Sequence, residues 1–370
     1  MATMQFAQTP GTVLVVVTRR IGDVLLATPL VRSIRRAWPG AAIDCLVFSG
    51  TEGVLACNPD LREVLTIAER PALREHFDFL RRIRRRYDLA LCTLPGDRPT
   101  IYAWQAGRKC AGLALPGIKH TWKRALLDAW CPFDDRGTHS VTGNLSLARL
   151  IGVAPCPEVV AGWSEADASG VAAALPFDAR ATRYAVLHLF PKFRYKAWTA
   201  DGWHALAQWL AGEGLRIVLT GGGAADEIDY VARLAEQLPA GSVNLAGRLS
   251  FPQVACLIAG AAVYVGPDTA TTHLAAATGT PTIALFGPSN PVRWGPWPAG
   301  YSDAESPFAL RGSRTVNNVT LIQGKKDCVP CLLEGCERHL ESRSDCLDEM
   351  PAARVIDAVR GALLRASASA

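Results

Sequence analysis

The chain has 370 residues, of which 49% are hydrophobic and 20% charged, and its formal net charge is +5. This composition is typical of a folded globular protein and excludes a disordered one, and the length favours two domains of about 150 to 200 residues. Residues 1–10 do not resemble a secretion signal, and no apolar run reaches the roughly 18 residues that cross a membrane, so we expect a cytoplasmic protein.

The first half of the chain alternates short apolar strands with helices. We predict strands at Val13–Val17, Ala42–Phe48 and Leu89–Leu94, and a helix that ends near Trp38. This alternation predicts a parallel sheet covered on both faces, and ligands of such sheets bind beyond the carboxyl ends of the strands.

A second set of strands and helices follows the segment Pro155-Cys156-Pro157. We predict strands at Tyr184–Leu189, Arg216–Thr220 and Ala262–Val265, and helices at Ala200–Gly212 and Ala270–Ala277. The predicted fold is α/β, with two Rossmann-like open parallel-sheet domains that face each other across a cleft. We place the domains at residues 1–165 and 184–350, a linker at 166–183, and a C-terminal helix and tail at 351–370.

Asp23 follows Gly22 in the stretch RRIGDVLLATPL, where the first strand gives way to a helix. One interpretation is that Asp23 caps this helix, a position that aspartate favours. The alternative is that Thr28-Pro29 begins the helix, which leaves Asp23 in a loop at the sheet edge, where active sites collect. In that case Gly22 allows the loop to turn tightly.

The second candidate site is the loop GPDTATTH, from Gly266 to His273. Gly266-Pro267 is expected to turn the chain, and the threonines that follow offer hydroxyl and N–H groups at the positive end of a helix, which suits a pyrophosphate. Asp268 would repel an anion, so we expect it to cap the helix or to accept hydrogen bonds from sugar hydroxyls. His273 lies in the first helical turn, where a packing role and a binding role both stay open.

Motifs of other nucleotide-binding classes are missing from the sequence. It has no G-x-x-x-x-G-K-[ST] motif and no G-x-G-x-x-G after a strand. Arginines cluster in two segments and indicate either solvated helix faces or a phosphate-rich partner; they are Arg32, Arg35, Arg36, Arg81, Arg82, Arg84, Arg85 and Arg86. No motif supports nucleic acid as that partner.

The sequence contains eleven cysteines, most of which we expect to be small buried side chains in a reducing compartment. The last four follow the spacing C-x2-C-x4-C-x9-C and are Cys328, Cys331, Cys336 and Cys346. Structural zinc, disulfides and reduced thiols all stay open for them. A catalytic metal is not expected, because no mixed histidine and carboxylate ligand set accompanies these cysteines.

Four motifs together resemble glycosyltransferase family 9, the lipopolysaccharide heptosyltransferases. They are RRIGDVLLATPL, the YKAW of Tyr195–Trp198, PDTATTH and the LFGPSNPVRWGPW of Leu285–Trp297, and they occur in the family's order. GDVLLATP, SFPQVACLI and FGPSNPVRWGPW are most similar to the heptosyltransferase III branch. Leu26 and Ala270 replace a histidine and a glycine of the heptosyltransferase I branch, which argues against that branch.

The resemblance implies a GT-B fold whose N-terminal half binds the acceptor and whose C-terminal half binds the nucleotide-sugar donor. It implies inverting transfer of heptose from ADP-heptose to the inner core of lipopolysaccharide, with no cofactor or divalent metal required. Asp23 matches the general base, and Arg19 and Arg20 beside it are candidates for binding the acceptor. The donor-binding residues implied are Lys196, Asp268, Thr269, Ala270, Thr272 and His273.

The implied acceptor is anionic and membrane-anchored, so the protein would work in the cytoplasm or at the cytoplasmic face of the inner membrane. Arg84, Arg85 and Arg86 would then hold acceptor phosphates. Three alternatives stay open: a nucleotide-sugar 2-epimerase of the same architecture, a transferase of this family with another donor, and a non-catalytic sugar-nucleotide-binding subunit. The presence of both Asp23 and Lys196 counts against the last of these.

Overall fold

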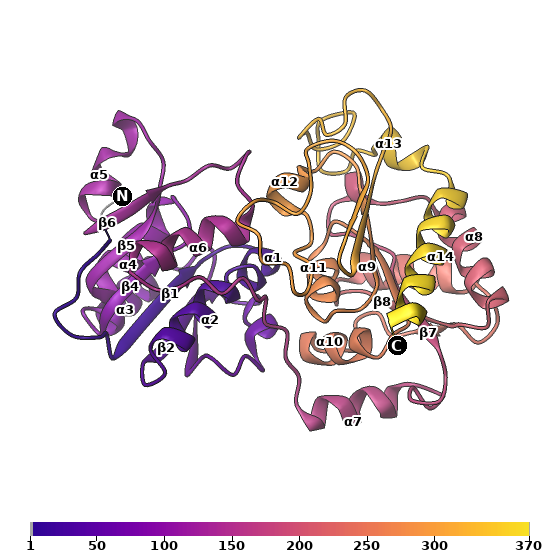
Figure 1. The fold of residues 1–370 in the computed structure, drawn as a ribbon, viewed down its shortest axis with the longest axis horizontal. Coiled ribbons are helices and arrows are strands. Elements are labelled where there is room, and N and C mark those ends of the chain that lie inside the picture. The colour runs from indigo at the N-terminus through magenta and orange to yellow at the C-terminus, as the bar shows by residue number, and fades with distance from the viewer. Residues whose placement is uncertain (1–2, 370) are drawn as a thin grey trace. The chain divides into compact units, whose positions relative to one another are not determined.

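The computed structural model describes residues 3–369 and divides the chain into two compact units (Figure 1). Unit 1 consists of the chain up to Gly162 together with Ser302–Ser306, and unit 2 of Trp163–Tyr301 and the chain from Pro307 onward. Each unit is built around one sheet with helices on its faces, so the predicted α/β class is confirmed.

The sheet of unit 1 has six strands in the order β3-β2-β1-β4-β5-β6, and every neighbouring pair is parallel. β1 lies at the centre and is almost fully buried, as its run of valines requires. In chain order the strands are Thr12–Val17, Ala42–Phe48, Glu63–Ile67, Tyr87–Cys92, Gly107–Ala114 and Ala129–Pro132.

Two pairs of helices cover the sheet of unit 1: α2 packs on α6, and α3 packs on α4. The α-helices α1 to α6 are Ile21–Leu25, Thr28–Ala37, Leu73–Ile83, Asp97–Ala106, Thr121–Ala125 and Ser140–Leu150. Two short 3₁₀ helices, η1 and η2, lie at Glu52–Leu55 and Ile118–His120.

The sheet of unit 2 has seven strands in the order β12-β13-β11-β10-β7-β8-β9. Only the edge strand β12 runs antiparallel to its neighbour. The strands β7 to β13 are Tyr184–His188, Arg216–Thr220, Val243–Asn244, Val263–Pro267, Thr282–Phe286, Arg314–Val316 and Val319–Gln323.

The helices of unit 2 cover both faces of this sheet, with α14 against α8 on one side and α10 against α11 on the other. The α-helices α7 to α14 are Glu165–Ala174, Ala200–Gly212, Ala225–Ala235, Phe251–Ala259, Ala270–Ala277, Pro291–Trp294, Asp345–Asp348 and Ala352–Ser369, and the 3₁₀ helix η3 is Arg194–Lys196. Among the described residues, no helix is both long and apolar enough to span a bilayer.

Helix α7 begins at Glu165 and covers the first half of the stretch 166–183 where a linker was expected, and it packs on α10. Both helices begin with a capping box, formed by Ser164 with Asp167 and by Ser250 with Gln253. In each box the serine accepts an N–H group of the first turn, while the partner side chain accepts the N–H of the serine. These residues therefore specify a helix rather than an extended connection.

Candidate active site

Lys196 and Asp268 form a close ion pair in unit 2. The Nζ of Lys196 lies 2.6 Å from the Oδ2 of Asp268 and 3.5 Å from its backbone oxygen. The side chains are 18% and 7% exposed, so the pair is largely removed from water. An ammonium group has three N–H donors, and these two contacts leave one for a ligand.

The order of the strands in the sheet explains why these two residues meet. Lys196 ends η3, which follows β7, and Asp268 directly follows β10. β7 and β10 are neighbouring parallel strands, so the segments that leave their carboxyl ends lie close together. Open parallel sheets bind ligands beyond the carboxyl ends of their strands, here called the carboxyl edge of the sheet.

The carboxyl group of Asp268 is held in its ionised form. Burial is the largest single effect and would raise its pKa, but the charge of Lys196 and the hydrogen bonds from Lys196 and Ser289 together lower the pKa below its ordinary value. Asp268 therefore places a negative charge beside Lys196, and the pair as a whole is neutral. A bound diphosphate would therefore lie beside a neutral ion pair and would not be repelled by an isolated carboxylate.

His273 is buried in the first turn of α11 and is neutral at physiological pH. Burial, and then the charge of Lys196, lower its pKa to about 4, although Asp268 opposes the shift. Its Nδ1 has no hydrogen-bond partner within the described part of the chain. An unpaired buried ring nitrogen is costly to maintain, which is typical of a group that meets a ligand.

The start of α11 retains free N–H donors. Its N-cap is Thr269, whose backbone is extended, and the N–H groups of Thr272 and His273 both donate to the backbone oxygen of Thr269. Ala270 and Thr271 precede Thr272, the first residue whose N–H donates within the helix, so their own N–H groups point out of the helix end. Together with the dipole of this helix they form an electropositive end suited to an anion.

The hydroxyl of Thr272 points into the protein, whereas the sequence suggested that it is available to a ligand. The side chain is fully buried, and its hydroxyl donates to the backbone oxygen of Pro267 at 2.5 Å. It also lies 2.9 Å from the hydroxyl of Tyr264 and 3.3 Å from that of Thr269. Thr272 therefore holds the loop in shape, and a donor can reach it only indirectly.

Gly266 and Pro267 belong to strand β10, so the expected turn at this dipeptide is wrong. The structure explains in another way why position 266 is a glycine: a Cβ atom here would lie 2.3 Å from the hydroxyl oxygen of Tyr264. Glycine is therefore required because the tyrosine ring and hydroxyl pass close to the backbone. Tyr264 was not identified from the sequence, where it is one apolar strand residue among several.

Asp23 lies in unit 1, in the one-turn helix α1 at the carboxyl end of β1. Its Oδ2 is 3.3 Å from the Nε of Arg19, and its side chain is 15% exposed. Gly22 has helical backbone within α1, so the expected tight turn at this glycine is absent. The longer helix α2 begins at Thr28, as one of the two interpretations proposed, and Asp23 stands ahead of it.

Arg20 is the N-cap residue of α1 and is exposed at the same edge of the sheet. The arginines expected to hold an acceptor are placed elsewhere. Arg84, Arg85 and Arg86 precede β4, so they lie at the amino ends of the strands, at the opposite edge of the sheet from Asp23. The idea that they bind the acceptor beside Asp23 is therefore wrong.

Arginines of the first long helix have structural partners. The Nε of Arg32 lies 2.5 Å from Asp60, and Arg36 pairs with Glu158 at 2.8 Å. Arg35 donates to three backbone oxygens. These side chains stabilise unit 1.

The four late cysteines share one region of unit 2, where their charges interact. Burial, followed by its cysteine neighbours, raises the pKa of Cys346 to about 12. All four are free thiols, and residues 3–369 contain no group of three or more His, Cys, Asp or Glu side chains arranged to hold a metal ion.

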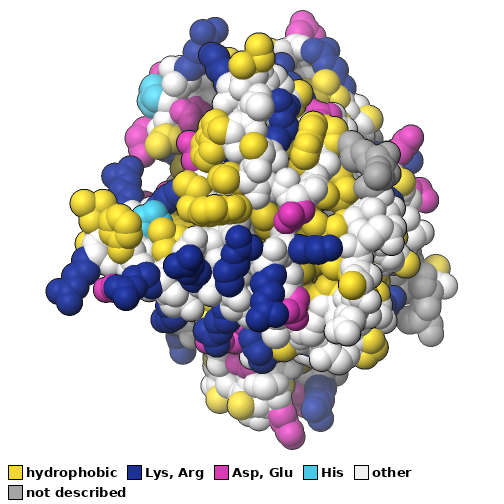
Figure 2. Space-filling view, turned by 90° about the vertical axis from the view of Figure 1, so that its left-hand side faces the viewer, with side chains coloured by type: hydrophobic (Ala, Val, Ile, Leu, Met, Phe, Trp, Pro, Cys, Tyr) yellow, Lys and Arg dark blue, Asp and Glu magenta, His cyan; other side chains and the backbone are white. Residues whose placement is uncertain are grey.

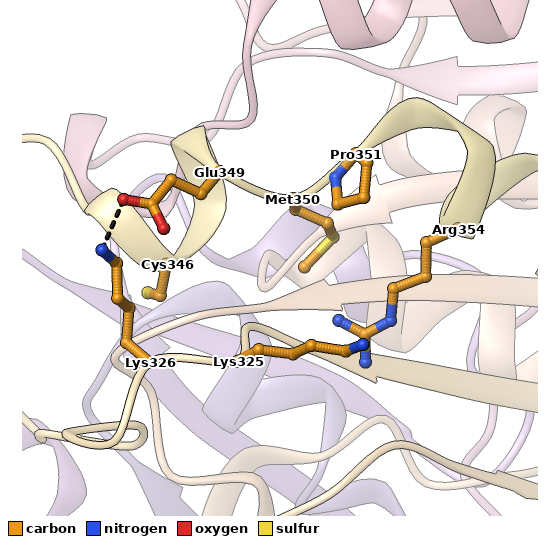
Figure 3. A pocket seen from close by; sticks show the side chains of 7 residues that line it. All are labelled: Lys325, Lys326, Cys346, Glu349, Met350, Pro351 and Arg354. Carbon is orange, nitrogen blue, oxygen red and sulfur yellow. Dashed lines mark ion pairs between the residues drawn. The ribbon is translucent and has the colours of Figure 1, made fainter.

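A cavity of about 110 Å³ lies beside Cys346, after the end of β13 (Figure 3). An ion pair between Lys326 and Glu349 crosses part of its wall. Its lining consists of Lys325, Lys326, Cys346, Glu349, Met350, Pro351 and Arg354. None of the predicted catalytic or donor-binding residues lines it, so it is separate from the candidate site.

The chain belongs to glycosyltransferase family 9. The model of that family, described as glycosyltransferase family 9 (heptosyltransferase), matches residues 79–306. This confirms the family resemblance of the sequence motifs, and the protein is an enzyme that transfers glycosyl groups.

The relatives with similar sequences include lipopolysaccharide heptosyltransferase 3 of Escherichia coli strain K12. It is 27% identical over 288 residues, which cover 75% of this chain and 82% of that protein. This relative belongs to the branch that the sequence motifs favoured.

Two solved structures show the same fold. The E. coli ADP-heptose lps heptosyltransferase II has a TM-score of 0.74 and 20% identity, covering 96% of this chain and 99% of that one. The E. coli heptosyltransferase WaaC with ADP has a TM-score of 0.71 and 22% identity, covering 95% and 99%. The predicted GT-B fold is thereby confirmed.

Proposed function

We propose that this enzyme moves a heptose from ADP-heptose onto the inner core of lipopolysaccharide, with inversion at the anomeric carbon and without a divalent metal. The observation that carries the proposal is the cluster of Lys196, Asp268, neutral His273 and the start of α11 at one edge of the unit 2 sheet. The related structures named above, one an ADP-heptose enzyme and the other a complex with ADP, support the choice of donor.

Unit 2 binds the donor diphosphate in this proposal. The remaining N–H of Lys196 and the N–H groups of Ala270 and Thr271 donate to phosphate oxygens, and neutral His273 contributes a further hydrogen bond. These donors are already in place, so they can stabilise the negative charge that builds up as the bond between C1 and the phosphate oxygen breaks. Asp268 orients Lys196 and accepts hydrogen bonds from the sugar.

Unit 1 supplies the base in this proposal. The acceptor hydroxyl attacks C1 of the heptose, its proton passes to the carboxylate of Asp23, and the electron pair of the broken bond leaves with ADP. A carboxylate is a weak base in neutral water, but the hydroxyl becomes acidic as its new bond forms, so Asp23 is sufficient. Arg19 orients this carboxylate through the 3.3 Å contact. Arg20, at the same edge, contacts the anionic acceptor.

The acceptor and its location follow from the same proposal. The partner is the anionic inner core of lipopolysaccharide, which the enzyme meets from the cytoplasm at the inner membrane surface. No cofactor is required, because protein cations and N–H donors replace a metal at the leaving diphosphate.

The experiment that tests the function is a transfer assay read by mass. The purified chain is incubated with ADP-heptose, with other ADP- and UDP-sugars, and with a panel of truncated core acceptors. We expect one acceptor to gain the mass of a heptose, and only in the reaction that contains ADP-heptose. Transfer of a different sugar would contradict the donor. Release of an epimerised nucleotide-sugar in the absence of an acceptor would instead identify a 2-epimerase.

A further inference from the structure

Unit 1 carries an exposed hairpin of residues 115–125, here called the docking hairpin, which the transfer chemistry does not use. It follows β5 and consists of a turn at Gly117, η2 and α5. Ile118 is 92% exposed and Trp122 is 45% exposed. They belong to the consecutive short helices η2 and α5, and both side chains are presented to solvent.

The docking hairpin is held firmly to unit 1 although these two side chains face outward. Lys123 is buried and binds Asp97 at 2.7 Å and the backbone oxygen of Pro95 at 2.9 Å. Arg124 donates to the backbone oxygen of Gly117 at 3.1 Å. The exposed apolar side chains are therefore presented by an ordered support.

The ionised side chains of residues 115–125 are all basic: Lys119, Lys123 and Arg124. Lys123 is neutralised by its ion pair with Asp97, so the charge available at the surface comes from exposed Lys119 and half-buried Arg124. Figure 2 shows the face of unit 1 that lies on the left of Figure 1, where Lys and Arg side chains and hydrophobic side chains both reach the surface. Tryptophan prefers the interface between water and lipid, and cations are attracted to anionic headgroups, so this combination fits a bilayer surface.

We propose that the docking hairpin binds the surface of an anionic lipid bilayer through Ile118, Trp122 and Lys119. Its position agrees with this role: β5 and β1 run parallel in one sheet, so the hairpin leaves the same edge as the segment with Asp23. A membrane held there brings an acceptor anchored in lipid to the edge that carries the base. The inference deepens the proposed function and rests on it for this last point only.

Vesicle sedimentation tests the proposal with the full chain. Vesicles of phosphatidylethanolamine with phosphatidylglycerol are compared with vesicles of phosphatidylcholine. We expect binding to the anionic vesicles that weakens with salt, a loss of at least tenfold in the Ile118→Ser/Trp122→Ser variant, and a smaller loss in Lys119→Glu. The matched control is Phe77→Ser, because Phe77 is 65% exposed but lies between the acidic residues Glu75 and Asp78.

Equal binding by the native chain and the double variant would overturn the proposal, as would an equal loss in Phe77→Ser. If the native chain is a dimer, the double variant is a monomer and vesicle binding is the same in both, the surface binds a second copy of the chain instead. Transfer to a soluble core fragment is measured in parallel and should be unchanged in the double variant. Absence of transfer by every protein, with vesicle binding intact, would contradict the proposed function and leave this inference standing.

Discussion

The Nζ of Lys196 and the Oδ2 of Asp268 lie 2.6 Å apart although 72 residues separate them in the sequence. The pair is buried enough for each charge to depend on the other. It also sits at the carboxyl edge of the sheet, beside the neutral ring of His273 and the start of α11. Its removal should therefore affect both donor binding and stability.

Lys196→Met should lower kcat/KM for the donor by about 10²- to 10³-fold, since it removes a preorganised donor at the leaving diphosphate. It should also destabilise the fold by up to about 3 kcal/mol, because Asp268 is left as an unpaired buried charge. Transfer kinetics and chemical unfolding measure the two effects. Lys192→Met is the control, because Lys192 is exposed in the same segment. Equal effects of the two substitutions would contradict a specific role for Lys196.

Adding Asp268→Asn to Lys196→Met should recover part of the lost stability but none of the activity. The double variant no longer contains an unpaired buried carboxylate, whereas the donor for the diphosphate is still missing. A double-mutant cycle on unfolding free energies gives the coupling between the two side chains. Additive losses of stability would show that the ion pair contributes nothing to the fold.

Tyr264→Phe should raise the KM for the donor severalfold and lower stability by about 1 kcal/mol, because the hydroxyl that holds Thr272 is lost. Tyr184→Phe is the matched control: its hydroxyl is also buried and donates to the backbone oxygen of Leu257 at 2.6 Å, away from the donor loop. We expect a similar loss of stability in the control with an unchanged KM. If both variants keep the native KM, Tyr264 only stabilises the fold.

His273 should contribute a pH dependence of stability. In the unfolded chain a histidine takes up a proton below about pH 6.5, whereas burial keeps His273 neutral down to about pH 4. The unfolded state binds the extra proton within this window, so the free energy of unfolding falls as the pH decreases from 6.5 towards 4. Above pH 6.5 the effect is absent.

Urea unfolding at pH 7 and pH 5 tests this linkage. His273→Asn should lose less stability between the two pH values than the native chain, by about 1 to 3 kcal/mol. His188→Asn should behave similarly, since burial also lowers the pKa of His188 to about 4. His339→Gln serves as the control because His339 is exposed. A His273→Asn variant with the native pH dependence would show that this ring is protonated in the fold.

Much of the fold follows from the sequence, because buried parallel strands are continuous apolar runs that stand out between helices. Ala42–Phe48, Ala200–Gly212, Arg216–Thr220 and Ala270–Ala277 have the predicted bounds. Turns were wrongly predicted at Gly22, where the backbone is helical, and at Gly266-Pro267, where it is extended. At Gly266 the cause is tertiary, because the residue accommodates the hydroxyl of Tyr264.

The candidate site was predicted as a set of residues but not as an arrangement. Lys196 and Asp268 meet because β10 lies next to β7, and that strand order is a property of the sheet that no local pattern encodes. For the same reason, the sequence could not show that Arg84–Arg86 and Asp23 lie at opposite edges of one sheet. The inward hydroxyl of Thr272 likewise depends on Tyr264, eight residues earlier on the adjoining strand.

The most direct test of the central claim is the rate of heptose transfer by an Asp23→Asn variant, measured beside its affinity for ADP. We expect kcat to fall by about 10²- to 10⁴-fold while the affinity for ADP stays native, because asparagine keeps the shape of the side chain but cannot take the proton. Asp135→Asn, at an exposed aspartate of the same unit, should leave both values unchanged. Transfer by Asp23→Asn at the native rate would contradict the assignment of Asp23 as the base.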